Sequence, residues 1–411
     1  MKRNLLARRD QGSEADGRPA QAGQSGVVLS HTMSFWLLAV LLGFLLFAAS
    51  APSPLYGIYA AMWHFSPLTL TAIYATYALA ALAGVLTTGR LSDHLGRRPV
   101  VILALVVQVA GMAAFILAHG VGALFAGRFL QGLGTGIASQ AISAWLLDLQ
   151  PRDHPRIGGI IGGISLLAGL AAGGLVSGLL VQYGPDPLHL IFWLLVGVFL
   201  LALLAAFAVP EINPRTPGWL QSLTPQIGIP PVARSLFAAS APSLIAIWAL
   251  AGLYLSLGPS LAVALLHTDS HIAGGLVILA LMGGGAAAAA FLQAADPRRI
   301  VARGSLILIA GVGLTLLAVL VSSPVGLYIG SLVAGIGFGP AFSGIFRSLA
   351  ALAPADKRSA LISAIYLIVY LAFGVPAVIA GMMVVRFGLR DTAYAYGLVV
   401  MVLAAVTLVA V

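Results

Sequence analysis

The chain contains twelve stretches of mostly apolar residues, separated by shorter polar segments. A helix needs about 20 such residues to cross a bilayer, because its rise is about 1.5 Å per residue and the hydrocarbon core is about 30 Å thick. The stretches lack the strict alternation of barrel strands. They predict twelve membrane-spanning helices, at approximately residues 34–59, 69–89, 99–119, 122–148, 157–182, 188–209, 238–265, 272–293, 303–321, 325–352, 358–384 and 391–410.

Composition agrees with an all-α membrane protein. Apolar residues make up 60% of the chain and charged residues 8%, whereas soluble domains carry about 25% charged residues. The chain has no cysteine, so disulfides and thiolate metal sites are excluded, and we expect neither a cofactor nor a metal. Residues 1–33 are polar and lack the apolar region of a signal peptide, which predicts a disordered cytoplasmic tail.

The net charge of +9 first suggests a nucleic-acid partner, but the distribution of the basic residues argues against one. Most of the 21 Lys and Arg residues fall in the segments that lie on one side of the predicted bundle. This is the positive-inside pattern, and it predicts a multi-pass cell-membrane protein, in the inner membrane if the cell is Gram-negative, with both termini cytoplasmic.

A proline-rich segment and an internal repeat divide the chain into two halves. Residues 210–237 interrupt the hydrophobic pattern and predict a cytoplasmic linker between bundles at 34–209 and 238–411. A shift of 203 positions places Gly132, Gly134 and Gly136 on Gly335, Gly337 and Gly339. The alternative to a repeat is coincidence, because glycine is abundant in this chain. If the repeat is real, it predicts two pseudo-symmetric six-helix bundles that rock about a central site, the mechanism called alternating access.

The loop at residues 89–99 reads GRLSDHLGRRP. It resembles the signature of the major facilitator superfamily, G-x-L-[AS]-D-x-x-G-R-[RK], through Gly89, Leu91, Asp93, Gly96, Arg97 and Arg98. The resemblance implies a twelve-helix transporter in which this loop latches the two halves on the cytoplasmic side. The alternative is that the arginines only enforce the topology.

The residues of the loop suit such a latch on physical grounds as well. Gly89 permits close helix approach and Gly96 a left-handed turn. Asp93 can cap a helix or pair with arginine, and Arg97 and Arg98 can clasp a carboxylate. We expect two more residues at this gate. Asp148 should pair with Arg97. Arg347 lies near the same surface and either snorkels or pairs there.

The predicted helix 122–148 has one polar face. It consists of Arg128, Gln131, Thr135, Ser139 and Ser143, which helical geometry places near one line. An arginine inside a span is costly unless it faces protein or water, so it indicates a functional site. The helix resembles a second motif of the superfamily, which implies a cavity position for Arg128 and a link to proton transfer. The alternative is that these side chains only join helices and that Arg128 bonds to carbonyls.

The repeat places an aromatic face opposite this polar one. Phe338, Phe342 and Phe346 fall on or next to Thr135, Ser139 and Ile142 after the shift. We therefore expect a cavity with one polar and one aromatic wall, suited to an amphipathic or aromatic substrate, although a Phe stripe is also typical of plain packing. Further cavity donors could be Tyr56, Tyr366 and Tyr370, for which structural roles are an equal alternative.

Residues 165–174 read SLLAGLAAGG and resemble part of the superfamily's antiporter motif through Gly169, Gly173 and Gly174. The motif's proline is missing. The nearest resemblance is to the twelve-helix drug/proton antiporter-like branch.

Three functions remain open at this point. The first is proton-linked efflux of small amphipathic or aromatic compounds, although every carboxylate except Asp148 lies in a loop or tail. The second is uptake or facilitated transport of a small metabolite, including an anionic one. The third is a membrane sensor that binds ligand without transport. No phosphate loop, HExxH or GxSxG occurs, so we expect no enzyme. We expect a small-molecule substrate, protons and the lipid bilayer as partners of a functional monomer.

Overall fold

The computed structural model describes residues 28–151, 153, 157–213, 215–267, 270–354 and 357–410, and within them all regular elements are helical. Most of the expected N-terminal tail, residues 1–27, lies outside this part. The first helix begins at His31, three residues earlier than expected, where the side chain of Ser30 accepts from Met33 N at 3.3 Å.

The helices of the N-terminal half come first along the chain. They are α1 (His31–Ser50), η1 (Ser53–Leu55), α2 (Tyr56–Trp63), α3 (Pro67–Thr88), α4 (Leu91–Leu95), α5 (Arg97–Ile116), α6 (Val121–Leu149), α7 (Ile157–Tyr183) and α8 (Leu190–Ala206). The linker carries α9 (Trp219–Ser222) and η2 (Pro231–Ala233).

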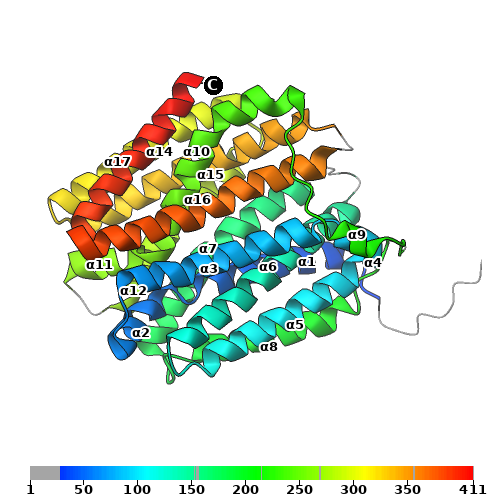
Figure 1. Ribbon diagram of the computed structural model, residues 1–411, viewed down its shortest axis with the longest axis horizontal. Helices are drawn as coiled ribbons and strands as arrows, with labels where there is room; N and C mark the ends of the chain where they lie inside the picture. The colour runs from blue at the N-terminus through cyan, green and yellow to red at the C-terminus, as the bar shows by residue number, and fades with distance from the viewer. Residues whose placement is uncertain are drawn as a thin grey trace, which may run out of the picture.

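The C-terminal half follows the linker. It contains α10 (Arg234–Ser256), α11 (Gly258–Leu266), α12 (His271–Ile278), the π-helical segment η3 (Leu279–Gly283), α13 (Gly284–Phe291), α14 (Pro297–Leu320), α15 (Pro324–Leu352), α16 (Arg358–Phe387) and α17 (Leu389–Ala410). In Figure 1, α14 to α17 lie together in the upper part and α1, α3, α5, α6 and α8 in the lower part.

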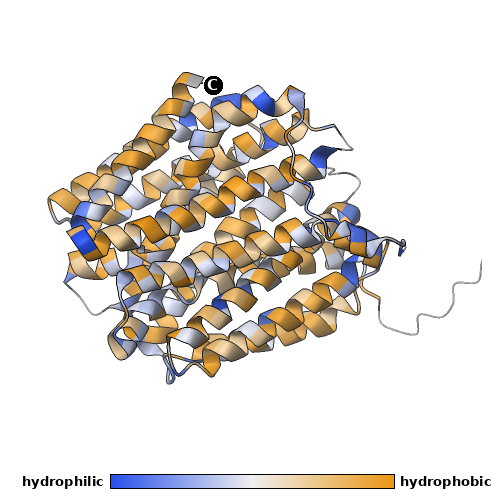
Figure 2. Ribbon diagram, viewed as in Figure 1, coloured by the Kyte–Doolittle hydropathy of each residue, from blue (hydrophilic) through white to orange (hydrophobic). Residues whose placement is uncertain are grey.

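The prediction of twelve apolar helices is confirmed. Each predicted span coincides with one helix or with consecutive segments such as α1–η1–α2, α10–α11 and α12–η3–α13. Among the described residues, ten helical runs are long and apolar enough to cross a membrane, and Leu190–Ala206 is a shorter apolar helix. The twelfth predicted span is the 29-residue α6. It is long enough to cross a membrane but is less apolar than the others, because of its polar face. Figure 2 shows hydrophilic residues mainly toward the two ends of the bundle.

We name the two ends of the bundle by the segments that lie there. The linker end carries α4 and α9, at the right of Figure 1, and the far end carries α2 and α11, at the left. Because the long helices run back and forth between these ends, the depth of a residue follows from its position in its helix.

The glycines of α6 and α15 pack in the same pattern, which supports the repeat. A Cβ at Gly132 or Gly136 would collide with a carbonyl of α3, and a Cβ at Gly134 would meet α5. In the second half, Gly335 and Gly339 lie against η3 and α13 in the same manner, and Gly337 lies against α14. Since the outer two glycines face one neighbouring helix and the middle one faces another in both halves, the matched positions have matched packing roles.

Two interruptions of the helices repeat as well. The first span breaks between α1 and α2 around Pro52 and Pro54, and the seventh breaks at Leu257 between α10 and α11. His64 and His267 then end these spans with positive φ angles of 52° and 48°, and their numbers also differ by the shift. Both breaks lie toward the far end, so each half has a discontinuous helix there.

The halves contact each other mainly where α3 meets α16 and where α7 meets the span formed by α12, η3 and α13. At the far end, Gly381 lies against Leu68 and Thr71, and Gly178 lies against His271 and Ile272. A hydrogen bond runs there from His271 N to Gln182 Oε1 at 3.0 Å. Among the described residues, no hydrogen bond or ion pair joins the helices of the two halves at the linker end. The far end is therefore the better-sealed end in this structure.

These close contacts predict a position-dependent cost of adding one methyl group. Gly132→Ala should lower the free energy of unfolding by about 1–3 kcal/mol, because its Cβ has no room beside the carbonyl of Tyr77. The matched control is Gly159→Ala, where nothing lies within 4 Å of the added Cβ. Thermal unfolding of both purified variants in one detergent measures the difference. Equal melting temperatures would show that α6 and α3 do not pack as described.

Candidate functional site

Arg128 on α6 is the most deeply buried charge among the described residues, with 0% of its surface exposed. Its Nε donates to Tyr56 Oη at 2.7 Å, and its Nη1 donates to Ala49 O at 2.7 Å and to Gln131 Oε1 at 2.8 Å. No carboxylate in the described part of the chain pairs with it. The charge is thus held by neutral groups only.

Tyrosine rings supply the rest of its surroundings. The guanidinium carbon lies 4.3 Å from the ring centroid of Tyr74 and 5.4 Å from those of Tyr56 and Tyr77. Such cation–π contacts are worth about 2 kcal/mol when desolvated, and Tyr74 is fixed in place by a hydrogen bond between its hydroxyl and Ser53. The break between α1 and α2 makes this possible, because it brings Ala49, Ser53 and Tyr56 to one side of α6.

One arm of the guanidinium remains open. Nη2 of Arg128 is buried and has no hydrogen-bond partner, and a buried unpaired charged donor costs about 1–3 kcal/mol or more. An acceptor placed beside Nη2 would remove this cost.

Gln108 of α5 extends the network and was missed by the sequence analysis. Its Nε2 donates to Thr135 Oγ1 at 2.7 Å and to Gln131 O at 3.0 Å, and its Oε1 has no partner. Gln131 in turn donates to Ala48 O at 2.7 Å. A single amide inside an apolar span was the available signal, because such a group is expensive in a membrane.

The predicted polar face of α6 divides into two parts. Arg128, Gln131 and Thr135 are fully buried and joined in the network, whereas Ser139 is half-buried and Ser143 is exposed. Ser139 donates only to Gly136 O within its own helix, at 3.2 Å. The stripe therefore becomes more accessible toward the linker end.

The C-terminal half carries an aromatic cluster, which we define as Trp248, Phe338, Phe342 and Phe346. The ring of Trp248 on α10 lies edge-on to Phe338 and Phe342, at centroid distances of 5.8 and 5.2 Å, and Phe342 and Phe346 lie 6.2 Å apart. The three phenylalanines were predicted from the repeat, whereas Trp248 was not. Its Nε1 is buried without a partner, so the cluster contains one unpaired donor.

Tyr366 and Tyr370 lie on α16, the helix that contacts α3. Their rings are stacked with centroids 6.1 Å apart, and Gly374, one turn further along α16, lies against Ala75 and Ala78 of α3. On α3, Tyr77 contacts Arg128 by its ring. Aromatic rings therefore lie on both of the helices that meet here, α3 and α16.

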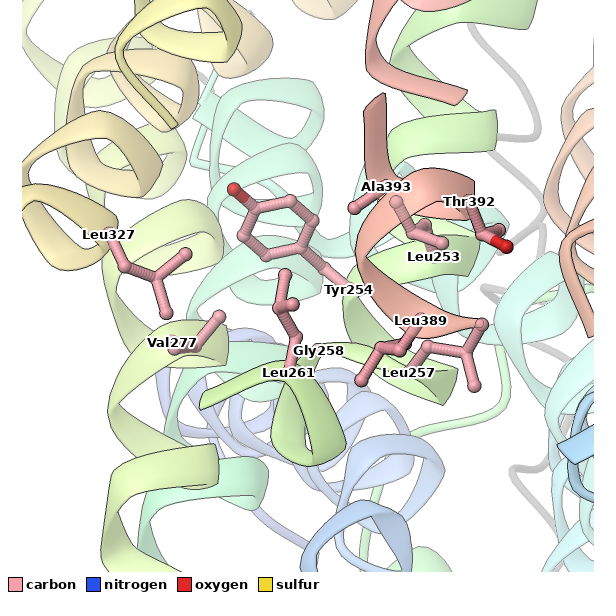
Figure 3. Close-up of a pocket in the computed structure, with 10 residues that line it drawn as sticks. All are labelled: Leu253, Tyr254, Leu257, Gly258, Leu261, Val277, Leu327, Leu389, Thr392 and Ala393. Atoms are coloured by element: carbon pink, nitrogen blue, oxygen red, sulfur yellow. The ribbon is translucent and has the colours of Figure 1, made fainter. Parts of the chain in front are cut away.

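A small apolar pocket lies at the far end of the C-terminal half (Figure 3). It is lined by Leu253, Tyr254, Leu257, Gly258, Leu261, Val277, Leu327, Leu389, Thr392 and Ala393. Its volume is about 20 Å³, close to what one water needs, and the hydroxyl of Tyr254 is already bonded to Ser331 at 3.0 Å. The pocket is a packing gap, too small for a substrate.

The predicted latch forms a compact group at the linker end. Arg97 donates to Asp93 Oδ1 at 2.5 Å, to Asp148 Oδ2 at 3.1 Å and to Ser92 Oγ at 2.7 Å. The expected pair with Asp148 is present. Gly96 has a positive φ of 93°, as its place before α5 requires.

Glu211 in the linker is the residue of this group that the sequence analysis missed. Its two carboxylate oxygens accept from the backbone N of Arg97 at 3.1 Å and of Arg98 at 2.7 Å. These amides begin α5 and have no partner inside the helix, so a carboxylate there satisfies them and interacts well with the helix dipole. No helix-start pattern reveals it, because the cap comes from more than 110 positions later.

Further bonds attach the start of the linker to the N-terminal half. Trp145 Nε1 donates to Pro210 O at 3.1 Å, and Thr216 N donates to His94 O at 2.9 Å. Asn213, with its amide oxygen turned toward Arg97, accepts from Nε and Nη2 at 3.0 Å each. Residues 209–213 and Thr216 are therefore held against α4, α5 and α6.

Three expectations for the gate need correction. The guanidinium of Arg98 donates to Val209 O at 2.5 Å, so its backbone N, not its side chain, meets a carboxylate. Gly89 approaches only the carbonyl of Val85 in its own helix. Arg347 donates to Gln293 O at 2.5 Å and Ala295 O at 2.7 Å, so it braces the turn between α13 and α14 and neither snorkels freely nor forms an ion pair.

Two repeated six-helix bundles, discontinuous helices at equivalent places and a buried polar site near their contact define a secondary transporter fold. The chain belongs to the Major Facilitator Superfamily, whose family model matches residues 35–375. It is therefore not an enzyme.

Curated relatives match parts of the chain. Multidrug resistance protein MdtL of Klebsiella pneumoniae is 28% identical over 157 residues, which cover 38% of this chain and 39% of the relative. Myo-inositol transporter 1 of Cryptococcus neoformans var. grubii is 39% identical over 79 residues, covering 19% of this chain and 14% of the relative. The matches thus span well under two thirds of these relatives.

Solved structures match nearly the whole chain. A POT family transporter in complex with 5-aminolevulinic acid superposes with a TM-score of 0.74 at 14% identity, covering 92% of this chain and 95% of that one. A bacterial homolog of the human lysosomal transporter Spinster, inward-facing and unoccupied, gives 0.73 at 13% identity, covering 92% and 96%. At these identities the likeness confirms the fold.

The Arg128 network predicts that lysine cannot replace this arginine. Arg128→Lys keeps the charge but loses the forked donors, and one hydrogen bond to a charged group contributes about 1.5–3 kcal/mol. We expect transport to fall by about 10- to 100-fold, measured as initial flux in proteoliposomes. Arg390→Lys is the matched control, since Arg390 also bonds two carbonyls, Val319 O and Leu320 O, but at the far end. Equal losses in both variants would remove the special role of Arg128.

The cap on α5 predicts a role for Glu211 in stability. Glu211→Gln should destabilise the linker end by about 1.5–3 kcal/mol, because two helix amides lose a charged acceptor. Asp186→Asn, which removes an exposed carboxylate paired only with His189, should change stability by less than about 1 kcal/mol. Hydrogen exchange at the amides of Arg97 and Arg98 reports the effect locally, and unchanged protection would contradict the capping role.

Proposed function

We propose that this protein exports small amphipathic or aromatic compounds in exchange for protons, by alternating access between its two halves. The observation that carries the proposal is the chemical contrast between the halves at equivalent positions. The shift places Arg128 on Ser331 and Thr135 on Phe338. The N-terminal half therefore holds a hydrogen-bonded arginine and its polar network. At the equivalent positions the C-terminal half has a small hydroxyl group and aromatic rings.

This contrast suits a substrate that has both an apolar ring and a polar group. The aromatic cluster offers ring edges and faces, which favour stacked or edge-on aromatic partners. The unpaired Nε1 of Trp248 and Nη2 of Arg128 offer hydrogen-bond donors to the polar part. The partial match to a multidrug resistance protein agrees with this substrate class.

The positions of the Arg128 network and of the proposed gate support alternating access. The halves are sealed at the far end, and the polar face of α6 becomes accessible toward the linker end. The proposed gate at that end consists of Asp93, Gly96, Arg97, Arg98 and Asp148, to which the structure adds Glu211. When the linker end closes, this group would meet the other half, and loss of an ion pair there would shift the balance between states.

Orientation and driving ion belong to the proposal. The distribution of basic residues supports an orientation in the cell membrane with the linker end and both termini on the cytoplasmic side. Among the described residues, carboxylates within the spans lie only at their ends, as Asp148 and Asp391. Proton coupling through Asp148 would therefore act at the gate, and the protein would function as a monomer with its site between the two bundles.

Uptake of a small anionic metabolite is the second candidate. The observation that favours it is the buried guanidinium without a carboxylate partner, since a carboxylate on the substrate would provide the missing acceptor for Nη2. The two candidates differ in the charge of the substrate and in the need for a proton gradient.

Flux assays in proteoliposomes with an imposed pH gradient separate the candidates. Movement of amphipathic aromatic probes that follows the gradient supports proton-linked export. Flux of small carboxylates without any gradient supports the second candidate, and saturable binding without flux would indicate a sensor.

Trp248→Phe tests the aromatic wall within the same assay. The ring stacking survives, but the donor is lost, so the apparent affinity for probes with an acceptor should fall by about 5- to 10-fold, as for one neutral hydrogen bond. Trp193→Phe on α8, where the side chain is 56% exposed, is the control and should bind as the parent does. An unchanged affinity in Trp248→Phe would place the substrate elsewhere.

A further inference from the structure

A cavity of about 290 Å³ opens at the linker end of the C-terminal half, away from the Arg128 network. Its walls come from three elements. They are the end of α13 with the following turn, the first turns of α14, and the middle of α15, represented by Leu292, Ala295, Asp296, Arg299, Ile300, Arg303, Gly304, Ile307, Ile336 and Pro340. At this size it is large enough for part of a lipid or a small ligand.

The cavity has a basic mouth. Arg299 and Arg303 lie one turn apart on α14, both exposed, and no hydrogen bond or ion pair is recorded for either guanidinium within the described residues. One carboxylate, Asp296, also lines the cavity, but its Oδ1 accepts from Arg299 N at 3.0 Å as the cap of α14. Two guanidinium groups and one carboxylate leave the mouth net positive.

The equivalent loop of the N-terminal half is different in this respect. There, Arg97 is neutralised by Asp93 and Asp148, and Glu211 caps the helix. In the C-terminal half, Arg347 bonds to Ala295 O and so fixes the wall of the cavity, while Arg299 and Arg303 remain available. The start of α14 thus carries arginines without ion pairs, whereas at the start of α5 the arginine is paired with two carboxylates.

The deeper wall of the cavity is apolar and opens toward the lipid-facing surface. Between Arg299 and Ile307 the cavity follows α14 for about 12 Å, at about 1.5 Å per residue. Ile300, Ile307, Ile336 and Pro340 line it. Ile336 is partly exposed, as is Leu332 one turn before it on α15. Pro340 has no N–H to donate to the carbonyl of Ile336, which leaves an acceptor near the cavity for a hydroxyl group.

We propose that this cavity binds an anionic phospholipid, with the phosphate between Arg299 and Arg303 and one acyl chain along α14. The positive charge of the two arginines favours a lipid phosphate, because basic pockets between helices at the membrane surface bind such head groups. The apolar length decides against a free anion, which would leave the cavity behind the arginines unfilled. The site is independent of the transported substrate.

The test uses the full chain, purified and delipidated in detergent, with binding counted by native mass spectrometry. Phosphatidylglycerol should bind and raise the melting temperature, whereas phosphatidylcholine and inorganic phosphate should do neither. Equal binding of inorganic phosphate would replace the lipid site by a simple anion site, and equal binding of phosphatidylcholine would remove the role of the arginines.

Two pairs of substitutions separate a built site from diffuse surface charge. The double variant R299Q/R303Q should bind phosphatidylglycerol roughly 30-fold more weakly. The control R298Q/R215Q removes the same charge from exposed residues that do not line the cavity, and should lose less than about threefold. Equal losses would overturn the proposal.

Filling the apolar part tests the acyl chain separately. Ile307→Trp keeps both arginines but fills the cavity, so phosphatidylglycerol binding should fall. A cooperative thermal unfolding transition, measured in the presence of phosphatidylcholine, shows that the variant is folded. Unchanged binding in a folded Ile307→Trp variant would contradict the placement of the chain.

Discussion

The packing of the N-terminal half depends on one buried arginine that has no carboxylate partner among the described residues. Arg128 lies inside a span, where an ion is costly, and the described residues offer it no carboxylate. Its stability depends on carbonyls freed by the break between α1 and α2, on the amide of Gln131 and on three tyrosine rings. The break in the first span, the polar face of α6 and the aromatic content of α3 are consequences of one requirement, the solvation of a guanidinium without water.

The two halves share a scaffold and differ in what it holds. The glycine pattern that packs α6 against α3 and α5 is repeated where α15 meets α13 and α14, and both halves break a helix near the far end. Yet Ser331 stands where the shift would place Arg128, and an ordinary hydroxyl bond of 3.0 Å joins it to Tyr254. Backbone packing limits change at the glycines, because an added Cβ would meet a carbonyl, whereas the side chains between them are free to vary. The chemistry of the site is therefore asymmetric on a symmetric frame.

The twelve helices and the Arg97–Asp148 pair could be predicted because their signals are local or belong to a specific motif. A membrane span can be recognised by the length of its apolar stretch, and the role of Gly96 by the tight turn that its place in the motif requires. Trp248, Gln108 and Glu211 could not be placed in this way, since each gains its role from residues far along the chain. Gln108 bonds to Thr135 across two helices, and Glu211 completes a helix that begins 114 positions earlier. The roles assigned to the cavity and gate residues stay predictions, which the proposed flux and stability measurements address.

The attachment of Pro210, Glu211 and Thr216 to the N-terminal bundle changes where that half of the molecule ends. By composition the linker begins at 210, but Pro210, Glu211 and Thr216 are bonded to Trp145, Arg97 and His94. At its other end, Gly228 N donates to Ala360 O at 3.3 Å. The connector that can change length between the bundles is therefore only the segment around α9, much shorter than the polar stretch suggests. If the two bundles are produced as separate chains, the cut belongs after Gly218, because a cut at 210 would leave the first bundle without the anion that completes α5.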